Sequence, residues 1–243
     1  MKKKYFTKKN IVQKAEKMLS KIKKQVRQRN FVCQIRNSAI LVLDMQNYFL
    51  NRESHAFVPS SKAIINNIKK LVDIFLINKG LVIFTKHSNN EQNANMMTKW
   101  WSDSITENSE LSGITKQLIY PGLVNIEKHQ YDAFYETNLK NLLNEKGIEN
   151  IIITGVLTHL CCETTARAAF VNGFSVILPI DGTADYNEKF HTGSILNLSH
   201  GFAYTVTTDT LLKNINSGLS QITQLNRNKT EKPHSSLPEG KGV

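Results

Sequence analysis

Three residues of the types used by hydrolytic enzymes follow separate apolar runs in this chain. Asp44, His87 and Cys161 each come shortly after such a run. A thiol becomes a nucleophile when it loses its proton, and a nearby carboxylate or imidazole can accept that proton. The pattern indicates nucleophilic catalysis, provided that the fold brings the side chains together. Asp44 alone is weaker evidence, because an aspartate that ends a strand is often only a turn or capping residue.

Cys161 and Cys162 are adjacent at the expected start of a helix. The unpaired N–H groups and the dipole at a helix N-terminus favour the thiolate form. Adjacent residues on a helix point about 100° apart, so only one of the two thiols can face a site. The alternative is that both are small buried apolar residues, as free cysteines commonly are.

Lys128 is a further candidate for chemistry. It stands close to Ile126, Tyr131 and Phe134 in the sequence. A lysine among apolar and aromatic groups can lie in a pocket where its charge is poorly solvated. The local sequence is equally compatible with an ordinary surface lysine.

Short apolar runs predict strands that are buried on both faces of a sheet. They are Ala39–Leu43, Leu81–Phe84, Ile151–Ile153, Ser175–Leu178 and Tyr204–Val206. Between them lie helical patterns: a stripe from Ile64 to Phe75, a second at Leu139, Leu142 and Leu143, and a third over about Cys161–Asn172. Strands that alternate with helices predict an α/β fold with a mostly parallel sheet. Ligands bind beyond the carboxyl ends of such strands, which is where the three candidate side chains fall.

The formal net charge of +11 belongs to the N-terminal segment rather than to the whole chain. Twelve of the 31 basic residues and one of the 20 acidic residues lie in residues 1–30, so the remainder is balanced at 19 of each. Apolar residues at helical spacing predict an amphipathic helix over residues 10–29. We favour a helix packed on the domain or on another subunit, with a solvated basic face, over one that contacts nucleic acid or an anionic membrane.

The chain therefore divides into a basic N-terminal arm at residues 1–30, one α/β domain at residues 31–225 and a polar tail at residues 226–243. The tail contains Pro and Gly and is expected to be flexible. No run of about 18 uncharged apolar residues is present, and no apolar signal segment follows the basic N-terminus. With only three cysteines, these features favour a reducing compartment, the cytoplasm.

Five motifs, in order, resemble those of the isochorismatase-like cysteine hydrolases, a superfamily that includes nicotinamidases and other small-amide hydrolases. The resemblance covers residues 36–212. Its motifs are DMQNYF at Asp44, FTKH ending at His87, MMTKWW ending at Trp101, EKHQYDAF containing Lys128, and TGVLTHLCCETTARAA containing Cys161. One such motif is weak evidence, whereas five in the same order are strong.

The resemblance implies a three-layer, doubly wound sheet of Rossmann-like strand order and a catalytic triad of Asp44, Lys128 and Cys161. In the family the nucleophile lies six residues after the Gly of the TGV element. Counting from Gly155 gives Cys161 and excludes its neighbour Cys162.

The resemblance also implies a cis peptide bond at Val156–Leu157. The backbone N–H groups of Leu157 and Cys161 would then form an oxyanion hole. Substrate contacts are expected from residues in or near the motifs, namely Gln46, His87, Trp101, Tyr131 and Phe134. Relatives are commonly dimers or tetramers, so we expect a homo-oligomer.

Two departures from the family pattern narrow the activity. Nicotinamidases typically carry a metal-binding Asp-x-His element after the second strand, whereas this chain has Thr85-Lys86-His87 there and no other close pair of histidine ligands. We therefore expect no metal and no other cofactor, which argues against nicotinamidase activity. Isochorismatases cleave a vinyl ether and have Gly in place of the nucleophile, whereas this chain keeps Cys161.

The sequence thus predicts a metal-independent cysteine hydrolase that cleaves a C–N bond of a small amide, carbamoyl or ureide compound through a thioester. Two alternatives stay open. One is a vinyl ether hydrolase that uses Asp44 and Lys128 while Cys161 is a bystander. The other is a non-catalytic scaffold whose basic arm binds nucleic acid or a membrane.

Overall fold

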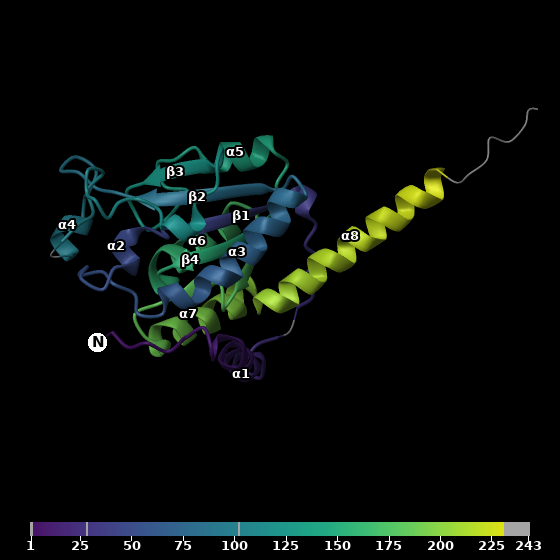
Figure 1. Cartoon of the computed structure of the whole chain (residues 1–243), viewed down its shortest axis with the longest axis horizontal. Coiled ribbons are helices and arrows are strands. Elements are labelled where there is room, and N and C mark those ends of the chain that lie inside the picture. Colours follow the sequence, from purple (N-terminus) through teal and green to yellow (C-terminus); the bar gives the residue numbers. More distant parts are fainter. Residues whose placement is uncertain (1, 28, 102, 231–243) are drawn as a thin grey trace, which may run out of the picture.

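A seven-stranded sheet forms the centre of the molecule, with the strand order β3-β2-β1-β4-β5-β7 and with β6 paired to β4 (Figure 1). The computed structural model describes residues 2–27, 29–101 and 103–230. All strand pairs are parallel. The strands are β1 (Ser38–Leu43), β2 (Leu81–His87), β3 (Val124–Lys128), β4 (Asn150–Val156), β5 (Ser175–Pro179), β6 (Thr183–Ala184) and β7 (Ala203–Val206).

The predicted α/β fold with a parallel sheet is confirmed, and every predicted strand is present. The central strand β1 is buried at all of its positions, which explains its continuous apolar run. Two strands were not predicted. β3 lies at the edge of the sheet and is largely exposed, so it carries no such run, and β6 has only two residues.

Helices cover both faces of the sheet and make three layers (Figure 1). α3 (Ser61–Ile77) packs against β1, β2 and β4 and touches α8 (Thr208–Thr230), whereas α6 (Glu163–Val171) packs against β5 and α7 (Glu188–Gly201) against β7. Right-handed crossovers put helices on opposite faces because the strand order reverses after β3. The shorter elements are α2 (Asn47–Leu50), α4 (Met97–Trp100), α5 (Leu139–Glu145), η1 (Ile35–Asn37), η2 (Lys116–Leu118) and η3 (Thr158–Cys162).

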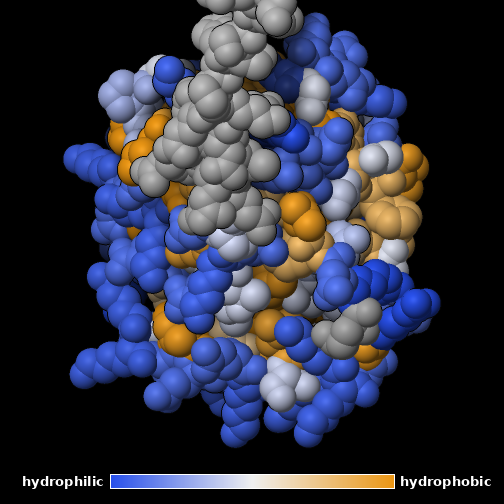
Figure 2. Space-filling view, turned by 90° about the vertical axis from the view of Figure 1, so that its right-hand side faces the viewer, coloured by the Kyte–Doolittle hydropathy of each residue, from blue (hydrophilic) through white to orange (hydrophobic). Residues whose placement is uncertain are grey.

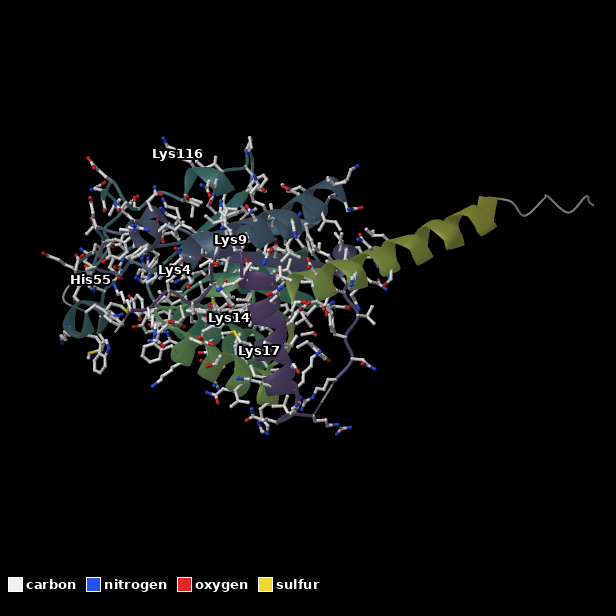
Figure 3. The ribbon with its side chains drawn as sticks, turned by 60° about the horizontal axis from the view of Figure 1, so that its bottom comes forward. Lys4, Lys9, Lys14, Lys17, His55 and Lys116 are labelled. Atoms are coloured by element: carbon white, nitrogen blue, oxygen red, sulfur yellow. The ribbon has the colours of Figure 1, made fainter. Side chains whose placement is uncertain are left out.

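The N-terminal segment is built onto the domain. Its helix α1 (Ile11–Lys23) buries five apolar residues and contacts α7, as the packed-helix interpretation predicts, but Val12 is exposed and the helix ends at Lys23 rather than at residue 29. Tyr5 and Phe6, which precede α1, are 4% and 0% exposed and belong to the main hydrophobic core. Several lysines lie along the outer side of this segment, as Figure 3 shows for Lys9 and Lys17.

The C-terminal helix α8 continues past residue 226, where the sequence predicts a flexible tail to begin. Residues 219–230 contain no Gly or Pro, so the sequence has no helix-stopping residue in this stretch. Residues 226–230 are therefore helical, and residues 231–243 lie outside the described residues. The end of the molecule seen in Figure 2 mixes hydrophilic and apolar residues. Within the described residues, no helix is both long and apolar enough to cross a bilayer.

Gly155 lies where β4 passes close to β1, and Gly147, which has no such close neighbour, serves as its control. Gly155 has φ +109°, and a Cβ atom there would lie 2.0 Å from the carbonyl oxygen of Leu43, whereas Gly147 has φ +62° with nothing within 4 Å of its Cβ position. We expect Gly155→Ala to lower the free energy of unfolding by about 3 kcal/mol or more, because overpacking adds to backbone strain. Gly147→Ala should lose only about 1 kcal/mol, from the left-handed conformation alone. Urea unfolding measures both, and equal losses would show that the close approach is unimportant.

Candidate active site

Asp44, Lys128 and Cys161 come from three segments and meet at the carboxyl end of the sheet. Asp44 follows β1, Lys128 ends β3, and Cys161 lies in η3 after β4. Lys128 Nζ lies 2.8 Å from Asp44 Oδ2 and 3.4 Å from Cys161 Sγ. Because β2 stands between β1 and β3, the long lysine side chain is needed to span the end of that strand. The three predicted catalytic residues form one contiguous group.

Neighbouring groups fix the carboxylate and the ammonium. Thr85 Oγ1, on β2, donates a hydrogen bond of 2.6 Å to Asp44 Oδ1. Lys128 Nζ donates to the carbonyl oxygen of Gln130 at 2.9 Å. Asp44 and Lys128 are both fully buried. Removing an isolated ion from water costs several kcal/mol, so each charge depends on the other.

The two charges keep each other ionised. Burial acts to raise the pKa of Asp44, but the charge of Lys128 together with hydrogen bonds from Lys128 and Thr85 holds that pKa below its ordinary value. Burial acts to lower the pKa of Lys128, but the charge of Asp44, with hydrogen bonds to Asp44 and Cys161, raises it above its ordinary value. At neutral pH the site therefore contains a carboxylate and an ammonium.

The thiol of Cys161 carries a proton at rest. Burial raises its pKa to about 12, and Lys128 opposes this rise only in part because Asp44 acts in the same direction as burial. The sequence argument that the start of a helix favours the thiolate is therefore outweighed by loss of solvent. The nearby Asp44 carboxylate is a base that can take this proton when a substrate arrives.

The turn after β4 has the geometry that the resemblance implies. The peptide bond between Val156 and Leu157 is cis. Leu157 and Cys161 both line the cavity that leads to the thiol. These are the two residues whose N–H groups the resemblance assigns to the oxyanion hole.

A cavity of about 60 Å³ opens onto Cys161. One water needs about 10–15 Å³ on this scale, so the cavity suits a small molecule rather than a polymer. Of the predicted substrate contacts, His87, Trp101 and Tyr131 line it. Trp101 Nε1 donates a 2.7 Å hydrogen bond to Tyr131 Oη, which ties two of these walls together.

Gln46 and Phe134, which were also predicted to contact substrate, are not among the residues that line this cavity. The amide of Gln46 is occupied by backbone groups: it donates to the carbonyl oxygens of His87 and Ser112 and accepts from the N–H of His87. It therefore braces His87 rather than reaching a ligand. Phe134 stacks on Phe174 with a centroid distance of 5.9 Å.

His87 is held with one ring nitrogen unused. Its Nε2 lies 2.8 Å from Asn89 Oδ1, whereas its buried Nδ1 has no hydrogen-bond partner among the described residues. Burial lowers the pKa of His87 to about 4, with a further contribution from Lys128, so the ring is neutral. Since an amide oxygen only accepts hydrogen bonds, Nε2 carries the proton and Nδ1 is an acceptor.

Sequence reasoning missed much of the cavity wall. The additional aromatic and polar lining residues include Tyr48, Phe49, His55, Asn89, Asp103 and Tyr186. Tyr48 was within reach, because it belongs to the DMQNYF motif, and its hydroxyl donates to Asp103 Oδ2 at 3.1 Å. Tyr186 follows the two-residue strand β6, which is too short to show a strand pattern in the sequence.

The resemblance to nicotinamidases raises the question of whether these residues could hold a metal ion. In the described part of the chain, no cluster of three or more His, Cys, Asp or Glu side chains is arranged to hold one. In the stretch Thr85-Lys86-His87, which stands at the family's Asp-x-His element, Thr85 donates to Asp44 and His87 Nε2 is bonded to Asn89 Oδ1. These residues do not fit a metal site.

The parallel sheet, the buried Asp–Lys pair and the thiol beside a small cavity define a hydrolase of the isochorismatase-like class. The Isochorismatase domain model matches residues 38–210. The chain is 36% identical to Nicotinamidase 3 of Arabidopsis thaliana over 184 residues, which cover 73% of this chain and 88% of the relative. The chain therefore belongs to the isochorismatase family.

Solved structures share the fold. A cysteine hydrolase from Pseudomonas syringae superposes with a TM-score of 0.74 at 21% identity, over 79% of this chain and 99% of the other. The pyrazinamidase of Pyrococcus horikoshii, solved in complex with zinc, gives a TM-score of 0.62 at 21% identity, over 70% and 99% of the two chains. The expectation of a hydrolase acting on C–N bonds agrees with the nicotinamidase relative and with the family.

Replacing Lys128 by an uncharged residue tests how much the buried Asp44–Lys128 pair contributes to stability. Because the folded pKa of Asp44 is depressed, its contribution to stability is complete above the unfolded carboxyl pKa of about 3.9 and is lost as pH falls below it. Lys128→Met leaves the carboxylate without a cation, and we expect a loss of about 3–5 kcal/mol in unfolding free energy at pH 7. At pH 4 the loss should be smaller, because Asp44 of the variant then binds a proton.

Urea unfolding at both pH values measures this difference. The exposed Lys116, labelled in Figure 3, provides the control. Lys116→Met should change stability by no more than about 0.5 kcal/mol at either pH. A loss in Lys128→Met that is the same at pH 7 and pH 4 would mean that the charge of Asp44 is not its source.

Proposed function

We propose that this protein hydrolyses a small planar amide to a carboxylic acid and ammonia, with Cys161 as nucleophile. The observation that carries the proposal is the position of the Cys161 thiol, which faces the cavity while Lys128 Nζ lies 3.4 Å behind it and holds Asp44. Cys162 is fully buried and is not among the cavity-lining residues, which supports the choice between the two adjacent thiols.

In the first half of the reaction, Asp44 takes the proton of the Cys161 thiol and the sulfur attacks the amide carbon. The carbonyl oxygen becomes negatively charged and is stabilised by the N–H groups of Leu157 and Cys161. Asp44 then gives its proton to the leaving nitrogen, so the C–N bond breaks and ammonia departs. The acyl group remains as a thioester on Cys161.

In the second half, Asp44 takes a proton from water and the hydroxide attacks the thioester carbon. The C–S bond breaks, the acid leaves, and the thiolate recovers its proton from Asp44. Lys128 stays protonated throughout and holds the carboxylate in place. This scheme consumes one water per amide and needs no redox partner.

The walls of the cavity favour a flat substrate. Seven aromatic rings, counting imidazoles, surround it: Tyr48, Phe49, His55, His87, Trp101, Tyr131 and Tyr186. Aromatic side chains bind planar ligands through offset or edge contacts. The unused acceptor Nδ1 of His87 offers a hydrogen bond to an N–H of the ligand. Nicotinamide returns to the candidates because of the 36% identical relative, even though the missing Asp-x-His element argues against it.

The assembly and compartment of the protein are further proposals. Large apolar side chains that are well exposed, Trp100, Phe170, Val171 and Phe190, support association into a homo-oligomer. All three cysteines are unpaired and buried, which supports a reducing compartment such as the cytoplasm. Because α1 buries five apolar residues against the domain, we retain the packed-helix interpretation over a contact with nucleic acid or membrane.

The nucleophile is tested by ammonia release from a panel of nicotinamide and other small amides, ureides and carbamoyl compounds. Cys161→Ala should lose about 10⁴-fold or more in kcat on the true substrate, because no other group can form the thioester. Cys162→Ala, the matched control, should keep near-normal turnover. Equal activity of Cys161→Ala and wild type would exclude the thioester and would favour the ether hydrolase that uses only Asp44 and Lys128.

The metal independence of the reaction is tested by a chelator. We expect full activity after dialysis against EDTA and no gain on adding Zn²⁺, because His87 and Asn89 are bonded to each other rather than arranged as ligands. Thermal melting before and after dialysis controls for damage to the fold. Activity that is lost on chelation and restored by a divalent metal would contradict this prediction.

A further inference from the structure

The first residues of the chain contact two loops that line the catalytic cavity, although they lie outside the matched Isochorismatase domain. The backbone N–H of Lys3 donates a 2.7 Å hydrogen bond to the carbonyl oxygen of Tyr186. Lys2 Nζ donates to the carbonyl oxygen of His55 and lies 4.5 Å from the centre of the Tyr186 ring. His55 and Tyr186 both line the cavity, and they come from separate parts of the chain. Figure 3, which labels Lys4 and His55, shows this side of the molecule.

Tyr5 supports the same loop from behind. Its hydroxyl accepts a 3.0 Å hydrogen bond from the backbone N–H of Asp185. The carboxylate of Asp185, which is fully buried, accepts hydrogen bonds from the N–H groups of His159 and Tyr186 at 2.8 and 2.7 Å. His159 lies between Leu157 and Cys161 in the turn that carries the thiol. Tyr5 is thus two hydrogen bonds away from that turn.

The segment is itself firmly anchored. The backbone N–H groups of Tyr5 and Phe6 both donate to Ser60 Oγ at 3.0 Å. Their rings pack on His191 with centroid distances of 5.2 and 5.3 Å. His191 Nδ1 in turn lies 2.9 Å from the hydroxyl of Thr158, the residue after Leu157. Buried contacts therefore set the position of the segment, and its first residues reach the rim of the cavity.

We propose that residues 2–6, called the N-terminal strap below, are positioning residues that fix the Tyr186 side of the cavity and limit the size of molecule that reaches Cys161. The strap ties the His55 loop to the Tyr186 loop, and its loss would free both to move outward. The proposal rests on the proposed function for the reaction that it serves. Its test measures access to the thiol, which does not depend on turnover.

Two single changes each remove one tie of the strap. Lys3→Pro removes the N–H that binds Tyr186, because proline has no backbone donor, and Lys3→Ala is the matched control that keeps the N–H. Tyr5→Phe removes the hydroxyl that accepts from Asp185. Lys17→Ala takes one exposed charge from α1 without touching the strap. Circular dichroism and thermal melting establish that each variant is folded.

The measurement is the rate of alkylation of Cys161 by iodoacetamide and by the bulkier N-benzyl iodoacetamide, with the adduct located by peptide mass. We expect Lys3→Pro and Tyr5→Phe to raise the ratio of the bulky rate to the small rate by about fivefold to tenfold, the range set by loss of one hydrogen bond. Lys3→Ala and Lys17→Ala should keep the wild-type ratio. KM for the true substrate should rise more than kcat falls, because the reacting groups are unchanged.

A ratio that is equal in all folded variants would overturn the proposal, as would an equal acceleration of both reagents, which indicates general loosening rather than a size limit. If Tyr5→Phe does not fold, the Lys3→Pro and Lys3→Ala pair decides alone. A wild-type protein that is alkylated at Cys161 but releases ammonia from no compound would contradict the proposed function, whereas the alkylation ratios would still decide on the strap.

Discussion

The charges of Asp44 and Lys128 are both removed from water, and each is compensated chiefly by the other. This pairing fixes the protonation states around Cys161, because a neutral thiol lies beside a carboxylate that stays ionised. The pairing also explains why the site lies at the carboxyl ends of three neighbouring strands. β1 and β3 present the two charges, and the end of β2 supplies Thr85 to the carboxylate and His87 to the cavity.

Because the sheet is parallel, most of the candidate catalytic residues could be predicted from the sequence to lie together. Buried strands leave continuous apolar runs, and their carboxyl ends meet at one edge, so Asp44, His87 and Cys161 could be placed near one another before any coordinates. Lys128 could not be placed this way, because the edge strand β3 is largely exposed and carries no apolar run. The motif resemblance supplied that residue, and it also separated Cys161 from Cys162.

The residues that line the cavity were harder to predict from the sequence, for physical reasons. Gln46 has the residue type of a substrate contact, but its amide is used up by backbone groups of β2 and of the segment at Ser112. Phe134 has an aromatic neighbour, Phe174, that no local pattern reveals. Tyr186 depends on a long-range contact with the N-terminal segment. Local spacing predicts which face a side chain takes, but it does not predict which distant segment will occupy that face.

The hydrogen bond between Tyr5 and Asp185 joins residues 180 positions apart. During synthesis Tyr5 therefore leaves the ribosome 180 residues ahead of its partner. Tyr5 and Phe6 cannot complete these contacts until the segment that contains Asp185 and His191 has also emerged. On this view the cavity reaches its final shape late in folding, and the thiol gains its closed surroundings only after the segment around Asp185 has been made.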